Sequence, residues 1–422
     1  MTAFYKLKPA RTLDHRPVWM TDPDIGRIFY ALHANADQTI TALFVGGCVR
    51  NALLGRPSDD IDIATLLPPE DVTSSLETND ISVIPTGVDH GTVTAILNDK
   101  SVEITTLRKD VETDGRRATI SFTTDWKQDA QRRDFTFNTL LADLDGTVFD
   151  PLGIGLEDLD KRIVRFVGTP EQRIREDVLR ILRFFRFHAY YGHGRPDENG
   201  LEACARLAHL IPGLSKERIT GEMSKIIESD NASDTLTLMA KNAIMPEFFA
   251  RYNEDALRDL IELQTECHTP SLIARYLALY SVSQDQLDKS RNFILYTNDQ
   301  LKKKNSIFQG ISYITATQDA SNALKQGRQC AYICSKEASI QAFLLKASNK
   351  EIQSEIAKEC VRALKNWKVP DFPINGHDLQ AIGIRPGKRM GEILKHTEKW
   401  WLENNFTPSR QECLEHIKTH FC

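Results

Sequence analysis

The stretch Phe44–Thr65, FVGGCVRNALLGRPSDDIDIAT, decides how the first part of this 422-residue chain folds. A short apolar run ends at Gly46-Gly47, and apolar residues then recur at helical spacing, which predicts a strand, a tight turn and the start of a helix. Two adjacent glycines let backbone amides approach a phosphate closely, and the N-terminus of a helix carries partial positive charge. Arg50 stands one turn into this helix, where its guanidinium can meet phosphate oxygens. The stretch therefore predicts an anion-binding turn.

Two carboxylates follow the predicted turn, within the run Asp59–Ile63. Because side chains alternate along a strand, we expect Asp60 and Asp62 on one face and the two isoleucines on the other. Carboxylates one pleat apart can hold a divalent metal ion. A Gly-Gly pair alone is usually only a turn, and two alternating aspartates alone are usually a solvated strand end. Together they predict one unit that holds a triphosphate beside Mg²⁺.

The combined pattern resembles the signature of the nucleotidyltransferase superfamily to which DNA polymerase beta belongs. Within that superfamily, GGCVR followed by DIDIAT is similar to the class II branch, which contains the bacterial CCA-adding enzymes and poly(A) polymerases. The resemblance implies an α+β fold class, with a small mixed-sheet head of the polymerase-beta type followed by an all-α elongated body. Asn51 departs from the family pattern, which generally has Asp after the arginine. We expect this change to remove one charge beside the turn and to alter how Arg50 is held.

Composition narrows the class of protein further. The chain is 41% hydrophobic and 26% charged, which is ordinary for a globular protein. No apolar run approaches the roughly 18 residues of a membrane-spanning helix, and the first residues lack the apolar core of a secretory signal. The eight cysteines are scattered singly without a zinc-site spacing, which indicates free thiols in a reducing compartment. We therefore expect a cytoplasmic protein with no membrane partner, and its oligomeric state stays open.

The net charge of −5 matters because an enzyme that acts on RNA needs positive potential somewhere on its surface. This balance of charges excludes a uniformly basic RNA-binding protein, but it allows a local patch of basic residues. The segment from Lys161 to Arg195 holds eight arginines against few acids and is the best candidate. A second cluster, Lys302 to Lys304, is expected to be only the solvated face of a helix.

Three runs rich in β-branched residues predict further strands of a small sheet: Ile81–Pro85, Gly91–Leu97 and Ser101–Leu107. Glu103, on the last run, either turns another carboxylate toward the metal or forms a cross-strand salt bridge, and the sequence favours neither. The segment Lys109–Asp125 carries several charges with weak periodicity. We expect it to be a mobile loop over the active site.

Two arginines beside an aspartate open the run Arg132–Thr139, which leads into another apolar strand. Arg133 suits contact with a triphosphate, and Asp134 suits contact with a ribose hydroxyl. Spacing alone favours a surface salt-bridge cluster. The run is similar, however, to the RRDxxxNA motif of the class II enzymes, which implies the functional roles, and Thr139 stands where Ala is usual.

A single helix is predicted over residues 169–192, with one apolar half and one polar half. Cations on the polar half repel one another unless an anion such as a nucleotide or RNA lies along them. The alternative is a solvated face with an Asp177–Arg180 pair at i, i+3. The string also resembles the EDxxR motif of the class II enzymes. That resemblance implies that Asp177 and Arg180 read the Watson-Crick edge of the incoming base, while Arg183 and Arg186 line the triphosphate or primer path.

From Leu201 onward, apolar residues recur at helical spacing almost throughout. The helix after Ser215 is expected to be structural, because it resembles the helix that braces the nucleotide pocket in class II enzymes. Near the end of the chain, Arg385, Lys388 and Arg389 flank a Pro-Gly turn between helices. These cations either grip an RNA phosphate or belong to a turn that only packs the tail on the helical body.

We therefore expect three parts: a nucleotidyltransferase head (residues 1–150), a nucleotide-recognition neck (151–240), and a helical body with an RNA-binding tail (241–422). By resemblance, the reaction is template-independent transfer of CMP, CMP and AMP from CTP and ATP to the 3′ end of tRNA. In that reaction Asp60 and Asp62 hold two Mg²⁺ ions.

Three other functions compete with this expectation. Poly(A) addition to RNA 3′ ends is the nearest, because both activities share every motif named above. A glycosyltransferase that uses the two aspartates leaves the Arg133 and Asp177 motifs unexplained. A non-catalytic RNA-binding module has no need of both metal-binding carboxylates.

Overall fold

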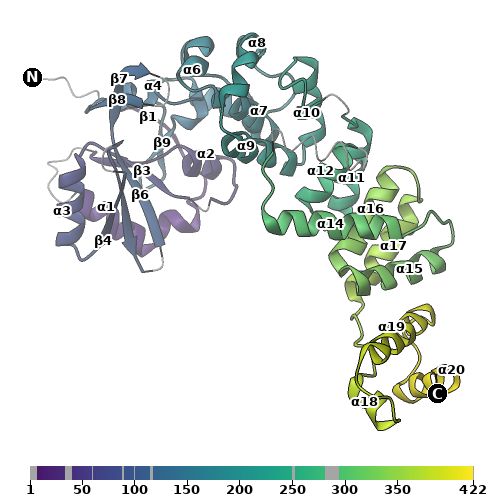
Figure 1. The fold of residues 1–422 in the computed structure, drawn as a ribbon. Coiled ribbons are helices and arrows are strands. Elements are labelled where there is room, and N and C mark those ends of the chain that lie inside the picture. Colours follow the sequence, from purple (N-terminus) through teal and green to yellow (C-terminus); the bar gives the residue numbers. More distant parts are fainter. Residues whose placement is uncertain are drawn as a thin grey trace, which may run out of the picture. The chain divides into compact units, whose positions relative to one another are not determined.

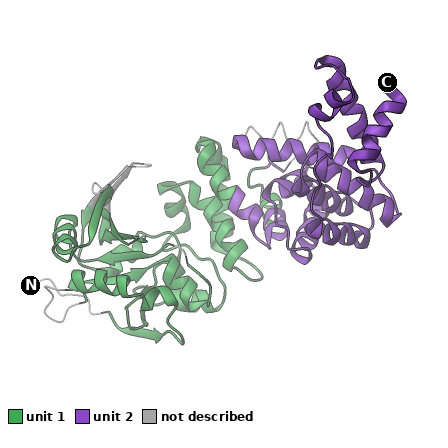
Figure 2. Cartoon of the chain, turned by 90° about the horizontal axis from the view of Figure 1, so that it is seen from below, with its two compact units in different colours: residues 1–223, 238–245 green, residues 224–237, 246–422 purple. Residues whose placement is uncertain are grey.

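The computed structural model describes most of the chain (Figure 1). The described residues are 7–33, 40–58, 60–87, 90–98, 100–114, 117–249, 252–280 and 294–421, with the backbone alone for 110–114 and 117–120. The chain divides into two compact units, residues 1–223 with 238–245 and residues 224–237 with 246–422 (Figure 2).

The first unit contains a mixed sheet, with eight strands among the described residues in the order β1-β10-β9-β2-β3-β6-β5-β4. The strands are β1 (Pro9–Thr12), β2 (Ala42–Val45), β3 (Asp62–Thr65), β4 (Ser82–Gly87), β5 (Thr92–Leu97), β6 (Lys100–Thr106), β9 (Leu141–Ala142) and β10 (Thr147–Phe149). β3 runs parallel to β6, and the other neighbouring pairs are antiparallel. The predicted mixed-sheet head is thus confirmed. Its central strands β2 and β3 carry the glycine turn and Asp62.

The centre of the sheet is packed on both faces. The helices around it are η1 (Val18–Thr21), α1 (Pro23–His33), α2 (Gly47–Leu53), α3 (Pro69–Thr78) and α4 (Trp126–Gln131). On one face, the ring of Phe44 lies 4.5 Å from that of Phe29 in α1. On the other face, Leu43 and Val45 pack in an apolar cluster with Trp126 of α4. Because β2 is held from both sides, the turn that follows it has a fixed position.

The strand that carries the metal-binding pattern is shorter than predicted. β3 begins at Asp62, so Asp60 lies just before the strand, and Asp59 lies outside the described residues. The parallel pairing with β6 starts at this same residue, opposite Glu103. The two aspartates therefore do not occupy successive pleats of one strand, although both stand at its start.

The segment predicted as a mobile loop is a β-hairpin, and that prediction is wrong. β7 (Arg108–Asp114) pairs antiparallel with β8 (Arg117–Phe122), while residues 115–116 lie outside the described part. These two strands form their own small sheet. A polar two-stranded ribbon lacks the strict alternation that burial of one face imposes, so its pattern resembles that of a loop.

The single helix predicted over residues 169–192 is divided in two. The helical elements here are η3 (Thr136–Asn138), α5 (Gly155–Asp160), α6 (Pro170–Glu176), α7 (Leu179–Tyr191), α8 (Glu198–Leu207), η4 (Ala208–Gly213), α9 (Lys216–Glu228) and α10 (Ala232–Lys241). Asp177 has an extended backbone (φ −152°, ψ 106°), and its carboxylate accepts a hydrogen bond from the amide of Leu179 at 3.1 Å. An aspartate that satisfies a free amide at a helix start favours a break that apolar periodicity does not reveal.

All regular elements in the described part of the second unit are helices, as predicted for the body. Its remaining helices are α11 (Glu254–Glu266), α12 (Leu272–Leu279), α14 (Asn298–Tyr313), α15 (Ala320–Ile333), α16 (Lys336–Ser348), α17 (Ser354–Asn366), α18 (Gly376–Ala381), α19 (Lys388–Glu403) and α20 (Arg410–Phe421). α16 is buried along its length at the centre of this bundle. No helix in the described part of the chain is both long and apolar enough to cross a membrane. The described cysteines are all free thiols, as expected.

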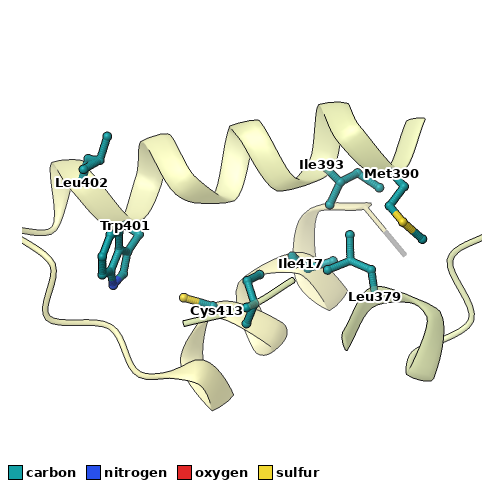
Figure 3. Close-up of a cluster of buried hydrophobic side chains, with 8 residues drawn as sticks. Leu379, Met390, Ile393, Trp401, Leu402, Cys413 and Ile417 are labelled. Carbon is teal, nitrogen blue, oxygen red and sulfur yellow. The ribbon is translucent and has the colours of Figure 1, made fainter. Parts of the chain in front are cut away.

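The tail helices α18, α19 and α20 enclose an apolar cluster that includes Leu379, Ile393, Trp401 and Ile417 (Figure 3). The ring of Tyr332, in α15, lies 5.7 Å from Trp401, so the tail also packs on the preceding helices. The cations of the neighbouring turn are Arg385, Lys388 and Arg389. All three are exposed. Nη2 of Arg389 donates to the carbonyl of Phe421 at 3.2 Å. Because packing uses the apolar residues, all three cations still face the solvent.

Candidate active site

The turn between β2 and α2 has the tight form that two glycines predict. Gly46 has a φ of 75°, a left-handed conformation that favours glycine, and its amide donates to the carbonyl of Leu140 at 3.1 Å. A Cβ atom here would stand 3.6 Å from Nη1 of Arg133. Helix α2 begins at the next residue, Gly47. Because glycine has no side chain, the backbone of this turn stays open beside Arg133.

Arg50 is buried, with 6% of its surface exposed, and neutral groups hold it. Nη1 donates to Oδ1 of Asn138 at 2.6 Å, and Nη2 donates to Oδ1 of Asn51 at 3.0 Å and to the hydroxyl of Tyr191 at 2.8 Å. The guanidinium carbon also lies 4.0 Å from the centre of the Tyr191 ring. Burial lowers the pKa of Arg50. Asn51, which departs from the family pattern, is therefore a direct partner of this arginine.

Carboxylates gather at the start of β3. Asp62 and Glu103 are register partners in parallel strands, so their side chains lie on the same face of the sheet. Burial raises the pKa of Asp62, and the charges of Glu103 and Asp60 raise it further, while Arg133 opposes them. Among the salt bridges of the described residues none includes Glu103, which favours its position beside the metal-binding pair over the cross-strand salt bridge.

This donor set fits a divalent metal ion. A bound cation relieves the repulsion that raises the pKa of Asp62. No cluster of three or more His, Cys, Asp and Glu side chains placed to hold an ion occurs in the part of the chain that the structure describes. Mg²⁺ is commonly bound by one or two carboxylates, with waters and substrate phosphates as its other ligands. The carboxylates therefore suit a metal that binds together with a triphosphate.

A buried aspartate that the sequence analysis missed organises the two motif arginines. Asp129 of α4 is 2% exposed and accepts hydrogen bonds from Nε of Arg132 at 2.8 Å and from Nη2 of Arg133 at 2.9 Å. Burial raises the pKa of Asp129, but the charges of Arg133 and Arg132 outweigh burial and lower it. Asp129 stays ionised and fixes the direction of both guanidinium groups.

Asp134 is almost saturated with hydrogen bonds. Oδ1 accepts from the amide of Phe135 at 2.9 Å and from Nδ2 of Asn138 at 3.0 Å, and Oδ2 accepts from Nε of Arg183 at 2.8 Å. Burial raises the pKa of this carboxyl, but Arg183 and Asn138 outweigh burial and lower it. A ribose hydroxyl would have to share Oδ2 with Arg183.

Each arginine on the polar half of α7 has a carboxylate partner inside the protein. Arg180 pairs with Glu176 at 2.7 Å, Arg186 pairs with Glu222 of α9 at 2.6 Å, and Arg183 pairs with the aspartate described above. The repulsion among these cations is therefore relieved without a ligand. The sequence argument that an anion must lie along this face is wrong, although the face can still bind one.

Asp177 pairs with Arg218 of α9, and the predicted alternative, a pair with Arg180 on a solvated face, does not form. Nη2 of Arg218 lies 2.9 and 2.8 Å from the two carboxylate oxygens of Asp177. The side chains of Arg218 and Asp177 are 26% and 34% exposed. Arg180 instead donates to the carbonyl of Arg173 at 2.9 Å as well as to its glutamate. Asp177 is therefore a fixed, accessible acceptor, held by a helix that the sequence assigned to structure alone.

All residues predicted for the site line one cavity of about 620 Å³ in the first unit. They are Gly46, Gly47, Arg50, Asp60, Asp62, Arg133, Asp134, Asp177, Arg180, Arg183 and Arg186. Arg132, Asn138, Leu179, Phe187 and Arg218 complete the lining. Seven arginines stand against four aspartates in the lining itself, so the cavity surface is cationic in a chain whose net charge is −5. Asp129, Glu176 and Glu222 pair with several of these arginines from behind the lining. Its volume and charge suit a nucleoside triphosphate.

Of the functional partners that the sequence analysis missed, Asp129 acts through local contacts, whereas Arg218 and Glu222 act through long-range contacts. Asp129 had a local signal, because it stands four residues before Arg133 in a helical stretch, the spacing of an ion pair. Arg218 and Glu222 also stand four residues apart, on one face of α9. The spacing in α9 does not tell which distant residues Arg218 and Glu222 contact.

Known proteins resemble this chain over nearly its whole length. Residues 42–165 match the family described as "Poly A polymerase head domain", and residues 195–254 match "Probable RNA and SrmB- binding site of polymerase A". The mitochondrial CCA tRNA nucleotidyltransferase 1 of Mus musculus is 33% identical over 406 residues, which cover 92% of this chain and 91% of that protein. The CCA-adding enzyme of Enterococcus faecalis is 29% identical, covering 90% of this chain and 92% of its own.

Solved structures share the fold. The Bacillus stearothermophilus CCA-adding enzyme in complex with CTP matches with a TM-score of 0.68 and 25% identity, over 94% of this chain and 98% of that one. The Thermotoga maritima CCA-adding enzyme complexed with tRNA has a TM-score of 0.67 at 18% identity, over 98% of this chain and 99% of that one. From the extent of the similarity to the mouse protein, the chain belongs to the family of CCA tRNA nucleotidyltransferases.

Proposed function

We propose that this nucleotidyltransferase adds CMP, CMP and AMP, taken from CTP and ATP, to the 3′ end of tRNA without a nucleic-acid template. The observation that carries the proposal is the convergence of the glycine turn, the aspartates and the arginines of α7 on one cationic cavity. Cations beside carboxylates suit a triphosphate next to a reacting hydroxyl. The similarity to CCA tRNA nucleotidyltransferases, which is nearly full-length, supports the same activity.

Asp60 and Asp62 would hold the divalent metal that the family uses, and we propose two Mg²⁺ ions. When bound, these ions supply activation of the RNA 3′-hydroxyl and neutralisation of the charge on the leaving pyrophosphate. The chain keeps its carboxylates together at the start of β3, with Glu103 as register partner. Asp129 holds Arg133 at the same cavity, where a guanidinium can bind phosphate oxygens.

The remaining cations would bind the triphosphate and the primer. Gly46 and Gly47 leave the backbone accessible to phosphate, and Arg50 lies directly behind them in the cavity lining. Arg183 and Arg186 extend the cationic surface along α7. For Asp134 we propose contact with the ribose hydroxyl, which would share the carboxylate with an arginine.

Asp177 and Arg180 would choose the base. Cytosine and adenine each present an amino donor beside a ring-nitrogen acceptor, whereas uracil and guanine present a carbonyl acceptor beside an N–H donor. An ionised aspartate accepts and an arginine donates, so this pair suits the first two bases and opposes the other two. Arg218 keeps Asp177 in place as an acceptor. Protein side chains would thus replace a template.

The second unit would recognise the RNA. We propose that the cations Arg385, Lys388 and Arg389, exposed beside the tail helices, contact the body of tRNA. The functional division we propose is a head over residues 1–150, a neck over 151–240, and a body with tail over 241–422. We propose the cytoplasm as the compartment, since free thiols persist there.

Poly(A) addition is the second candidate, because the matched head-domain family is named for poly(A) polymerase. Purified protein with Mg²⁺ and tRNA lacking its CCA end separates the two, with CTP and ATP supplied singly and together. CCA addition predicts extension by cytidines alone with CTP, no extension with ATP alone, and completion with both. Long extension with ATP alone would replace this proposal by poly(A) addition. Asp62→Ala serves as the inactive control.

A further inference from the structure

Arg50 differs from the other arginines of the cavity in the charge of its partners. Arg133, Arg183 and Arg186 each pair with a carboxylate. Arg50 is buried, yet no salt bridge among the described residues includes it. Its hydrogen bonds go to two amide oxygens and a phenol hydroxyl. Asp134 acts on Arg50 only through space and is itself paired with Arg183. A buried cation that has no directly paired counterion favours binding of an anion from outside.

Asn51 is oriented so that it can only accept from Arg50. Its Nδ2 donates to the carbonyl of Pro57 at 3.0 Å, which assigns the amide and turns Oδ1 toward Arg50. The same Oδ1 accepts from the hydroxyl of Tyr191 at 3.2 Å, and that hydroxyl in turn accepts from Arg50. Arg50, Asn51 and Tyr191 are thus joined by a closed set of hydrogen bonds, in which Arg50 alone carries a charge. An aspartate at position 51 would place a carboxylate oxygen against the Pro57 carbonyl.

Tyr191 limits the movement of Arg50 from a second direction. Its ring centre lies 4.0 Å from the guanidinium carbon of Arg50, and 5.1 Å from that of Arg56 on α2's following turn. An aromatic face attracts a guanidinium without cancelling its charge for other anions. Neither Asn51 nor Tyr191 lines the cavity, whereas Arg50 does.

We propose that Asn51 and Tyr191 are positioning residues that hold Arg50 through neutral contacts, so that its whole charge is available to the triphosphate of the incoming nucleotide. The identity of this ligand rests on the proposed function. Because the contact is to phosphate, CTP and ATP are affected alike. Asn51, which departs from the family pattern, thereby strengthens the binding of anions at the glycine turn.

The test compares Asn51→Asp with Asn51→Ala in the full chain. Inorganic tripolyphosphate with Mg²⁺ is titrated calorimetrically, and KM is measured for CTP and for ATP. An added carboxylate neutralises Arg50, so Asn51→Asp should weaken tripolyphosphate binding about tenfold and raise both KM values, with kcat retained. Asn51→Ala, which removes a hydrogen bond without adding charge, should do less. Tyr191→Phe should also raise both KM values together.

A purely structural role for Asn51 predicts no greater loss for Asp than for Ala. Both variants lose the hydrogen bond to the Pro57 carbonyl, and Asp alone keeps an oxygen that faces Arg50 and Tyr191. The proposal is therefore overturned if Asn51→Asp binds tripolyphosphate as tightly as Asn51→Ala does, or more tightly. Asn79→Asp, which adds the same charge outside the cavity of the same unit, is the control. If Asn51→Ala does not fold, Asn51→Asp is compared with Asn79→Asp. Equal binding of tripolyphosphate by these two variants overturns the proposal. The titration needs no RNA, so a protein that binds tripolyphosphate but leaves tRNA unextended refutes the proposed function alone.

Discussion

Replacing Arg218 by Ala should broaden the choice of nucleotide while leaving RNA binding nearly unchanged. Asp177 is held by one guanidinium nitrogen at 2.9 and 2.8 Å and by the amide of Leu179. Without Arg218, only the hydrogen bond from the amide of Leu179 orients the carboxylate of Asp177, and this side chain can turn away from the base. Arg218→Lys keeps the charge and serves as the matched variant, although it cannot reproduce the planar geometry.

The size of the effect follows from the exposure of the pair. With side chains 26% and 34% exposed, an ion pair of this kind contributes about 1 kcal/mol, so discrimination should fall roughly fivefold. Asp177→Ala removes the reading group itself, and by analogy with base readout elsewhere it should cost about 1 to 3 kcal/mol, or roughly tenfold to a hundredfold. The structure thus predicts a graded series: wild type, Arg218→Lys, Arg218→Ala, Asp177→Ala.

The assay is single-nucleotide incorporation on tRNA lacking its CCA end, with kcat/KM determined for CTP and UTP and for ATP and GTP. The ratio within each pair reports base choice, and the KM for tRNA reports RNA binding. Unchanged ratios in Arg218→Ala, together with a loss in Asp177→Ala, would show that Arg218 does not position the reader. Unchanged ratios in both would refute base reading by this part of the protein.

Three further outcomes are expected. Asp62→Ala should abolish transfer, at a cost of several kcal/mol of transition-state stabilisation, and leave the circular dichroism spectrum unchanged; wild-type turnover would remove the metal-site assignment. Asp129→Asn should lower the free energy of unfolding by about 3 to 5 kcal/mol at pH 7, because Arg132 and Arg133 lose their buried carboxylate partner. Since the folded pKa of Asp129 is lowered, wild type should lose this advantage progressively as the pH falls from about 4, the unfolded value, through the folded pKa. The denaturant curves of the two proteins should converge below the folded pKa. Reversing Arg385, Lys388 and Arg389 to Glu should raise the KM for tRNA and spare a short acceptor minihelix, and equal KM values for tRNA before and after would exclude tail contact.

Local patterns were sufficient to predict strand β2, the glycine turn and the helix that holds Arg50. Each depends on residues next to one another, and the conformation of Gly46, with a φ of 75°, is one that glycine adopts at little cost. The cavity residues were also predictable individually, because their motifs are short. Their convergence depends on the path of the chain between β2 and α7, which no local period encodes.

The departures from prediction have physical causes at particular residues. Asp177 interrupts a helix whose apolar periodicity continues across the break, since its carboxylate accepts the Leu179 amide. The parallel pairing that sets Glu103 opposite Asp62 is a long-range contact, so sequence left two positions for that carboxylate open. The arginines of α7 required no ligand because α9 supplies Glu222, more than thirty residues away from Arg186.

The most direct test of the central claim is the sequence of the nucleotides that the protein adds. Wild-type protein is incubated with Mg²⁺ and all four nucleoside triphosphates, with tRNA lacking its CCA end and, separately, with an unstructured RNA of the same length. The added 3′ ends are then sequenced. The account predicts C, C, A on tRNA, termination after that A, and little extension of the unstructured RNA. Adenosine runs of variable length on both RNAs would contradict it.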